Sequence, residues 1–499
     1  MLILGIDNGT QSTKTIALDF ESGEIVASAQ SAYGLVEGLP AGHLEQHPQT
    51  WIDAVSDTVG RCLSQLGDRR GEVAAIGVSG QQHGMVVLDK QDKPVRPAKL
   101  WCDTSTTAQC AEFEAAFGGQ KGLIELAGNA ILPGYTAPKI LWLKQNEPAS
   151  YKATNCVLLP HDYINFWLTG EKRMEYGDAS GTGLMDVRTR EWSRPLMDFI
   201  DPGLAGYIPK PETSQKAVGL LRESLRKEWG LEKSPVVSAG GGDNMMGAIG
   251  TGNIAPGVVT ASLGTSGTLY SFAEQPVVDS GGEVAAFCDS TDHWLPLVCT
   301  MNVTVATEQI RRLFGWDFPA LEKAILSAPA GCDGLLFLPY LNGERTPSLP
   351  GGSGVFHGLN TANMQPAHMA RAAAEGATLG LAYGLNRFRE LGIRPAEIRL
   401  TGGGSRSAAW RQITADIFGV PTVCLASSEG AALGAAIQAG WTCLAVNGQP
   451  LPLAAITKRL VQVEESTRSH PNAANGPLYA ALSEKQTDLT RRLHTGGYL

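Results

Sequence analysis

Two short loops carry glycine and threonine at matching positions, a pattern suited to binding phosphate groups. The first reads Asp-Asn-Gly-Thr-Gln-Ser-Thr over residues 7–13, and the second reads Ser-Leu-Gly-Thr-Ser-Gly-Thr over residues 262–268. Backbone N–H groups and hydroxyls in such turns suit the β- and γ-phosphate oxygens of a nucleotide. The candidate phosphate-binding residues are therefore Gly9, Thr10, Ser12, Thr13, Gly264 and Thr265.

Two aspartates stand where phosphoryl transfer needs carboxylates. Asp7 ends the first apolar stretch, where an oxygen ligand suits Mg²⁺, an ion that keeps much of its hydration. Asp243 follows three glycines, which let the backbone come close to a ligand, and its carboxylate can accept a proton from a hydroxyl. The same local sequences also fit an aspartate that caps a turn at residue 7 or an N-cap aspartate that precedes a helix at residue 243.

The elements that must position these residues alternate between strands and helices. Apolar residues recur at helical spacing from Pro48 to Leu66, which predicts a helix. Alternation of this kind predicts an α/β fold, and the shared strand–turn–strand setting of the two loops predicts two related domains. The strands expected around the two loops are 2–7, 14–20, 25–29, 72–80, 257–260 and 269–272.

A third glycine-rich turn lies late in the chain, between an expected strand at 397–401 and an expected helix at 407–418. Free N–H groups at the start of a helix make such a turn a candidate nucleotide site, although a plain tight turn has the same sequence. A long helix is expected over 366–391, and the polar tail from Glu464 is expected to end in a surface helix. A Gly/Pro-containing stretch at 250–256 predicts domains at 1–250 and 251–499.

Composition excludes several classes of protein. The chain has 499 residues, too many for one compact core, and its net charge of −9 offers no footprint for nucleic acid. No apolar run approaches the ~18 residues of a membrane span, and the N-terminus lacks the basic flank of a signal peptide. The nine cysteines form no Cys-x-x-Cys pair. We therefore expect a cytoplasmic enzyme without disulfides, a structural metal, or nucleic-acid or membrane partners.

Several ordered motifs resemble those of the FGGY carbohydrate kinases. They are Gly-Gly-Asp-Asn at 241–244, the stretches 134–146 and 354–359, and Glu375 downstream. The resemblance runs from about residue 1 to residue 440. It implies two actin-like (ribonuclease H-like) ATPase domains with ATP and a sugar in an interdomain cleft. It also implies Asp243 as the catalytic base, ATP and Mg²⁺ as cofactors with Asp7 toward the metal, and a possible homodimer.

The motifs expected to bind the sugar are most similar to those of the family branch that phosphorylates ketopentoses such as D-xylulose at the 5-hydroxyl. Gln82-His83 resembles a sugar-contacting pair of that branch, and residues 338–347 also resemble it. Cys102 departs from the asparagine expected between Trp101 and Asp103, which leaves the preferred sugar open. The resemblance implies sugar-binding roles for Gln82, His83, Trp101, Asp103 and Asn244, and an adenosine loop at Gly403, Gly404 and Ser407.

Other functions fit parts of this pattern. Another FGGY kinase, acting on ribulose, fuculose, gluconate or a sugar alcohol, would share most of the motifs. Glycerol is disfavoured, because glycerol kinases carry an Arg-Glu pair near the position of Gln82-His83. An actin-like chaperone or filament ATPase would need both Gly-Thr loops but would have no use for Asp243 beside a sugar-binding pair. The intact Asp243 also argues against a silent sugar sensor.

Overall fold

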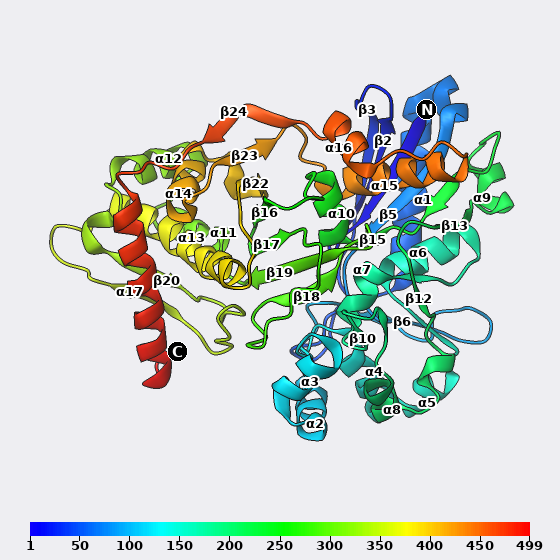
Figure 1. The fold of residues 1–499 in the computed structure, drawn as a ribbon, viewed down its shortest axis with the longest axis horizontal. Coiled ribbons are helices and arrows are strands. Elements are labelled where there is room, and N and C mark those ends of the chain that lie inside the picture. The colour runs from blue at the N-terminus through cyan, green and yellow to red at the C-terminus, as the bar shows by residue number, and fades with distance from the viewer. The chain divides into compact units, whose positions relative to one another are not determined.

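The computed structural model describes residues 1–499, which form two compact units that interleave along the chain (Figure 1). The chain first passes from unit 1 to unit 2 between Ile254 and Ala255, within the stretch 250–256 noted in the sequence. None of the helices combines the length and apolar character that a membrane span requires. Unit 1 comprises Met1–Ile254, Ala273–Leu295 and Glu429–Val461, and unit 2 comprises Ala255–Phe272, Pro296–Ser428 and Gln462–Leu499.

Unit 1 is built on a mixed sheet in the order β13-β14-β5-β1-β2-β3, with β15 added beside β5. The three N-terminal strands pair antiparallel, whereas β5 runs parallel to β1, β14 and β15. The predicted N-terminal strands are confirmed, with ends that differ by a few residues. The strands are β1 (Leu2–Asn8), β2 (Ser12–Asp19), β3 (Ile25–Ala32), β5 (Val73–Gly80), β13 (Ala217–Leu220), β14 (Val236–Ser238) and β15 (Gly241–Gly242).

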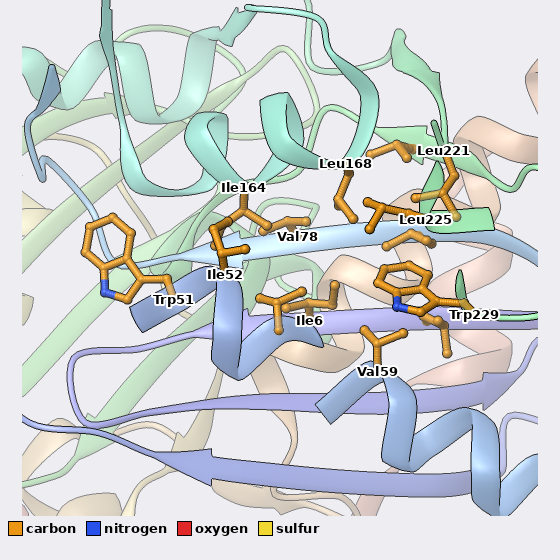
Figure 2. Packing of buried hydrophobic residues seen from close by; sticks show 14 of the residues in the cluster. Ile6, Trp51, Ile52, Val59, Val78, Ile164, Leu168, Leu221, Leu225 and Trp229 are labelled. Atoms are coloured by element: carbon orange, nitrogen blue, oxygen red, sulfur yellow. The ribbon is translucent and has the colours of Figure 1, made fainter. Parts of the chain in front are cut away.

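Helices cover both faces of this sheet. On one face α1 (Pro48–Leu66) and α6 (Pro160–Thr169) bury an apolar cluster that includes Ile6 and Val78 (Figure 2). Successive residues of a strand point to opposite faces, so Gly5 and Gly77 face the other side. There α15 (Gly430–Val446) packs on β1 and β5, orange over blue in Figure 1.

Glycines allow α15 to lie unusually close to its neighbours. A Cβ at Gly5 would lie 2.1 Å from the carbonyl oxygen of Ala432, so any larger residue would push the helix off the sheet. The helix α10 (Asp243–Gly250) crosses α15 in the same way, because a Cβ at Gly434 would lie 1.7 Å from the carbonyl oxygen of Met246. The helix that begins with Asp243 is therefore held by a segment late in the chain.

A second apolar cluster of unit 1 includes Met85, Phe113 and Ile140. The remaining helices of unit 1 are α2 (Thr107–Phe117), α3 (Gly119–Ala127), α4 (Thr136–Asn146), α5 (Pro148–Ala153), α7 (Tyr176–Ala179), α8 (Arg194–Ile200), α9 (Glu223–Glu228) and α16 (Leu453–Leu460). Its short strands are β4 (Glu45–Gln46), β6 (Val86–Leu88), β7 (Ala98–Lys99), β8 (Cys156–Leu158), β9 (Met174–Glu175), β10 (Met185–Asp186), β11 (Glu191–Trp192), β12 (Pro211–Glu212) and β18 (Ala285–Cys288).

Unit 2 repeats the central pattern of unit 1. Its sheet contains the order β19-β17-β16-β22-β23-β24, in which β16 pairs antiparallel with β17 and parallel with β22, as β1 does with β2 and β5. The strands are β16 (Val258–Leu263), β17 (Gly267–Ser271), β19 (Trp294–Thr300), β22 (Glu397–Thr401), β23 (Thr422–Leu425) and β24 (Val463–Ser469); β20 (Leu336–Pro339) and β21 (Gly354–His357) form a separate hairpin.

The helices of unit 2 include the long apolar helix expected from the sequence. They are α11 (Thr304–Leu313), α12 (Phe318–Ser327), α13 (Pro366–Glu390), α14 (Ala408–Phe418) and α17 (Gly476–Thr495). The expected terminal helix is present as α17, drawn in red in Figure 1, and it packs against α13 and α14. The polar tail does not pass directly into this helix: its first residues form β24, whose backbone pairs with β23.

Candidate active site

Strand register brings two carboxylates to one edge of the unit 1 sheet. Asp7 on β1 stands opposite Ser79 on β5, and Ser79 also stands opposite Gly241 on β15. The Ser79 hydroxyl donates to Asp7 Oδ1 at 2.9 Å. Asp243 comes two residues after Gly241 and is the first residue of α10; Gly242 is the N-cap, so Asp243 does not cap the helix as the alternative interpretation expected. Both carboxylates therefore lie where parallel strands end, the usual place for a ligand in α/β sheets.

The two carboxylates hold their protons more tightly than free aspartates do. Burial, together with the negative charge of Asp7, raises the pKa of Asp243 to about 7. Burial likewise raises the pKa of Asp7 to about 6, against the hydrogen bond from Ser79. A carboxylate with a pKa near neutrality is suited to accept a proton at neutral pH. Two such groups side by side also favour a bound cation.

Asn244 links Asp243 to the loop after β5. Its Nδ2 donates to Gln82 Oε1 at 2.8 Å and contacts Asp243 Oδ1 at 2.9 Å. The approach depends on Gly242, because a Cβ there would lie 2.6 Å from Gln82 Cγ. Three residues predicted to act together, Asp243, Asn244 and Gln82, are therefore joined by hydrogen bonds in unit 1.

His83 follows directly and has an unusual backbone. Its φ of 60° lies in the left-handed region, which non-glycine residues seldom adopt. The imidazole packs against two aromatic rings, with centroids 4.9 Å from Tyr135 and 5.4 Å from Phe287; those two rings lie 6.1 Å from each other, so the three form one cluster. A Cβ at Gly181 would lie 2.0 Å from His83 Cε1, so this glycine makes room for the ring. The backbone N–H of His83 donates to Asp178 Oδ1 at 3.4 Å.

The first Gly-Thr loop is tied to the predicted sugar residues through Thr10. The indole N–H of Trp101 donates to Thr10 Oγ1 at 2.9 Å, and this hydroxyl donates to Gln81 Oε1 at 3.3 Å. The side chain of Gln46 donates to the Thr10 carbonyl at 2.7 Å. Thr10, Trp101 and the loop that contains Gln82 therefore form one connected group.

Three further residues of this loop serve the turn itself. The Gly9 N–H donates to the Ser12 carbonyl at 3.0 Å and closes the turn between β1 and β2. Thr13 is fully buried, and its hydroxyl contacts Asn8 Nδ2 at 2.9 Å and Tyr33 Oη at 3.1 Å. The structure therefore shows Thr13 engaged inside the protein, and Gly9 and Ser12 shaping the loop backbone.

Asp103 is also engaged within the protein. It is fully buried, lies 3.1 Å from Lys99 Nζ and accepts a hydrogen bond from the Leu44 N–H at 2.9 Å. Asp103, His43 and Glu45 are close enough together to suggest a metal site. Lys99 Nζ already lies 3.3 Å from His43 Nδ1 and 3.2 Å from Glu45 Oε1. A lysine ammonium thus supplies the positive charge of this cluster.

In unit 2 the second Gly-Thr loop adjoins the glycine-rich turn. Gly402 has φ of 82°, and a Cβ there would lie 2.7 Å from the carbonyl carbon of Leu263, the residue before Gly264. A Cβ at Gly404 would meet Leu263 Cβ at 2.9 Å, while nothing lies within 4 Å of one at Gly403. Gly264, Gly403 and Gly404 thus gather at one end of β16.

Thr265 and Ser407 differ in how they are used. The carbonyl of Thr265 accepts from the Val303 N–H at 3.0 Å, which anchors the loop to the start of α11. Ser407 caps α14, since its hydroxyl accepts from the Trp410 N–H at 2.9 Å and also contacts Glu322. The hydroxyl of Ser407 is therefore occupied within the protein, and its backbone remains the candidate contact to a nucleotide.

Sequence reasoning missed several residues that position this site. Ser79, Gln46 and Gln81 link the strands and loops around Asp7 and Thr10, and Asp178 holds the His83 backbone. A serine or a glutamine does not by itself indicate a functional site in a sequence, because both residue types are common on any protein surface. Lys139 lies within the family motif at 134–146, but the motif alone did not indicate a role for this residue.

Comparisons with known proteins assign the fold and the reaction class. Residues 2–250 match the N-terminal domain of the FGGY family of carbohydrate kinases, and residues 259–443 match its C-terminal domain. A xylulose kinase of Haemophilus influenzae is 40% identical over 97% of this chain and 98% of the relative.

Solved structures agree with this match. A xyloylose kinase from Brucella ovis has a TM-score of 0.92 and 30% identity, covering 99% of this chain and 100% of the other. A gluconate kinase from Lactobacillus acidophilus has a TM-score of 0.91 and 25% identity, covering 99% and 98%. Two domain matches that together span most of the residues, with the two-unit α/β fold, show that this chain belongs to the FGGY family of carbohydrate kinases.

Proposed function

We propose that this carbohydrate kinase transfers the γ-phosphate of ATP to the 5-hydroxyl of D-xylulose, giving D-xylulose 5-phosphate and ADP. The observation that carries the proposal is the Asp243 carboxylate, whose pKa of about 7 suits a general base and which is joined through Asn244 to Gln82. The sugar is supported by the full-length similarity to a relative named xylulose kinase.

Asp243 accepts the proton of the sugar hydroxyl as the oxygen attacks the γ-phosphorus in line. Asn244 holds the Asp243 carboxylate through its side-chain amide and binds Gln82, so the base and the sugar contacts keep a constant spacing. His83 presents its imidazole beside Tyr135 and orients the ketose. Phosphoryl transfer is mainly a matter of such positioning and of charge stabilisation.

The residues present fit Mg²⁺. Asp7 and Asp243 both offer carboxylate oxygens, and Mg²⁺ prefers oxygen ligands of this kind. Burial raises the pKa of both groups, and the negative charge of Asp7 contributes to the raised pKa of Asp243. Asp7 would hold the ion directly or through water. When bound, Mg²⁺ supplies positive charge that neutralises the phosphate oxygens.

The two Gly-Thr loops are the proposed phosphate contacts. In unit 1 the turn closed by Gly9 directly follows β1, the strand that carries Asp7, and it contains Thr10. In unit 2 Gly264 and Thr265 stand at the equivalent end of β16. Gly403, Gly404 and the backbone of Ser407 lie in the turn next to Gly264 and are proposed for the adenosine.

Gluconate is the second candidate acceptor. The fold matches a gluconate kinase almost as well as a xyloylose kinase, so overall shape does not separate the two sugars. Cys102, between Trp101 and Asp103, is the position that departs from the ketopentose pattern. The sugar must therefore be tested directly.

The test is an ADP-release assay with D-xylulose, ribulose, fuculose, gluconate, glycerol and sugar alcohols, each compared by kcat/KM. The highest value is expected for D-xylulose, and a higher value for gluconate or for a sugar alcohol would overturn the assignment.

Asp243→Asn should lose ~10²-fold or more in kcat, the scale of general-base loss. Asp53→Asn, an exposed change on α1, is the matched control and should keep full activity. Near-normal turnover by Asp243→Asn would remove that residue from the role.

A further inference from the structure

Lys139 is a fully buried lysine that the proposed chemistry does not use. It lies in the first turn of α4, within the motif at 134–146, and its side chain is 0% exposed. Its Nζ donates to the carbonyl oxygen of His83 at 2.8 Å and to that of Gly134 at 2.7 Å. One ammonium therefore joins two segments that are far apart in sequence, the loop after β5 and the loop before α4.

Burying a lysine is costly, so this one needs a reason. Desolvation lowers the pKa of Lys139 to about 7, while the carboxylates of Asp103 and Asp178 favour its charged form. An apolar residue would fill the same space at lower cost, but it could not donate to two carbonyls. Only a side chain with hydrogen-bond donors can bind the carbonyls of His83 and Gly134.

The backbone of His83 is the part that needs this support. A left-handed conformation costs roughly 1–2 kcal/mol for a non-glycine residue and persists only where its surroundings impose it. Here the carbonyl of His83 accepts from Lys139 Nζ and from Thr136 Oγ1 at 3.1 Å, both on α4. The N–H of the same residue donates to Asp178. Side chains thus hold both sides of the His83 backbone.

The hydrogen bond from Lys139 to the Gly134 carbonyl also constrains the backbone next to Tyr135. Gly134 immediately precedes Tyr135, whose ring centroid lies 4.9 Å from that of His83. Lys139 therefore fixes the backbone beside His83 and the backbone beside Tyr135 through a single group. The relative position of these two rings depends on this link.

We infer that Lys139 is a positioning residue for the sugar site, where its ammonium ties the carbonyls of His83 and Gly134 together and so holds the rings of His83 and Tyr135 in one arrangement. The inference rests on the proposed function in one respect, the contact of His83 with the sugar. Lys139 would thus act through His83 and Tyr135, without itself touching a reacting atom.

The decisive variant is Lys139→Met, which keeps the length of the side chain and removes its donors. We expect the KM for D-xylulose to rise by about 10-fold to 100-fold, the loss that follows a displacement of about 1 Å, with the KM for ATP unchanged. The Kd for D-xylulose without nucleotide, measured by calorimetry, should rise by the same factor. Lys144→Met on the same helix, at a half-exposed lysine, is the matched control and should change neither constant.

Sugar and nucleotide readouts separate positioning from a general loss of structure. An unchanged Kd for D-xylulose in Lys139→Met, or equal rises in the KM for sugar and for ATP, would overturn the inference. If Lys139→Met does not fold, Thr136→Val decides, because it removes one donor to the same His83 carbonyl. That variant should raise the sugar KM alone by a few-fold, and an unchanged sugar KM would overturn the inference. Wild-type protein that binds no ketopentose would instead refute the proposed function.

Discussion

A methyl group at residue 181 is the smallest change that should displace the His83 ring. The Cβ of Gly181→Ala would lie 2.0 Å from Cε1 and 2.2 Å from Nδ1 of His83. Non-bonded carbon atoms rest at about 3.5 Å, so the ring must retreat by roughly 1.5 Å. Tyr135 and Phe287 pack against the ring, so a retreat toward either of them would displace that ring as well. The φ of Gly181 is not in the left-handed region, so alanine adds no backbone strain.

The expected losses of activity and stability follow from this displacement of the His83 ring. A misplacement of about 1 Å can reduce a rate by about 10²-fold, so kcat/KM for D-xylulose should fall by that order in Gly181→Ala. The KM for ATP should stay within about two-fold of the wild-type value, because the clash involves His83 and not the Gly-Thr loops. Overpacking should also lower the free energy of unfolding by about 1–3 kcal/mol.

The assay is coupled ADP release over a range of sugar and ATP concentrations, with urea unfolding of each variant. Gly60→Ala in α1 is the matched control, because no atom lies within 4 Å of a Cβ there. It should match the wild type in activity. Folded Gly181→Ala protein with an unchanged kcat/KM for D-xylulose would show that His83 does not contact the sugar.

Three further predictions concern acidity, the nucleotide and stability. Burial raises the pKa of Asp243 to about 7, and only its carboxylate form accepts a proton, so kcat/KM for the sugar should fall about tenfold for each unit that the pH drops below about 7. A flat profile down to about pH 5.5 would exclude this base. Thr265→Val should raise the KM for ATP more than that for sugar, and the reverse order would reassign the second loop. Tyr479→Phe removes hydrogen bonds to Glu375 at 2.7 Å and to Arg371 at 3.1 Å, so the free energy of unfolding should drop by about 1–3 kcal/mol; an unchanged urea midpoint would contradict this.

Local features of the fold were predictable because they depend on neighbouring residues. Pro48 and the apolar spacing that follows it mark the start of α1, and the Gly-Thr loops mark the hairpins β1–β2 and β16–β17. The sequence also placed Asp243 beside a glycine turn, and α10 begins there. Each of these signals lies within about twenty residues of the element that it specifies.

Side-chain partners from distant segments were not predictable. Phe287 lies beside His83 although about two hundred residues separate them, and no periodicity connects the two. Asp103, which stays a predicted sugar contact, accepts a hydrogen bond from the Leu44 N–H, 59 residues away. The hydroxyl of Ser407, in a turn predicted to bind a ligand, contacts Glu322, 85 residues away. The sequence names candidate groups, whereas tertiary packing decides which remain available.

The close contact between α10 and α15 has a consequence for synthesis of the chain. Domains usually fold in order as they leave the ribosome. Here the segment Glu429–Val461 belongs to unit 1, so the close contact of Gly434 with Met246 forms only after that segment has emerged. A fragment ending at Ile254 would leave the helix of Asp243 without its partner. Unit 1, which contains Asp243, is therefore completed only late in translation.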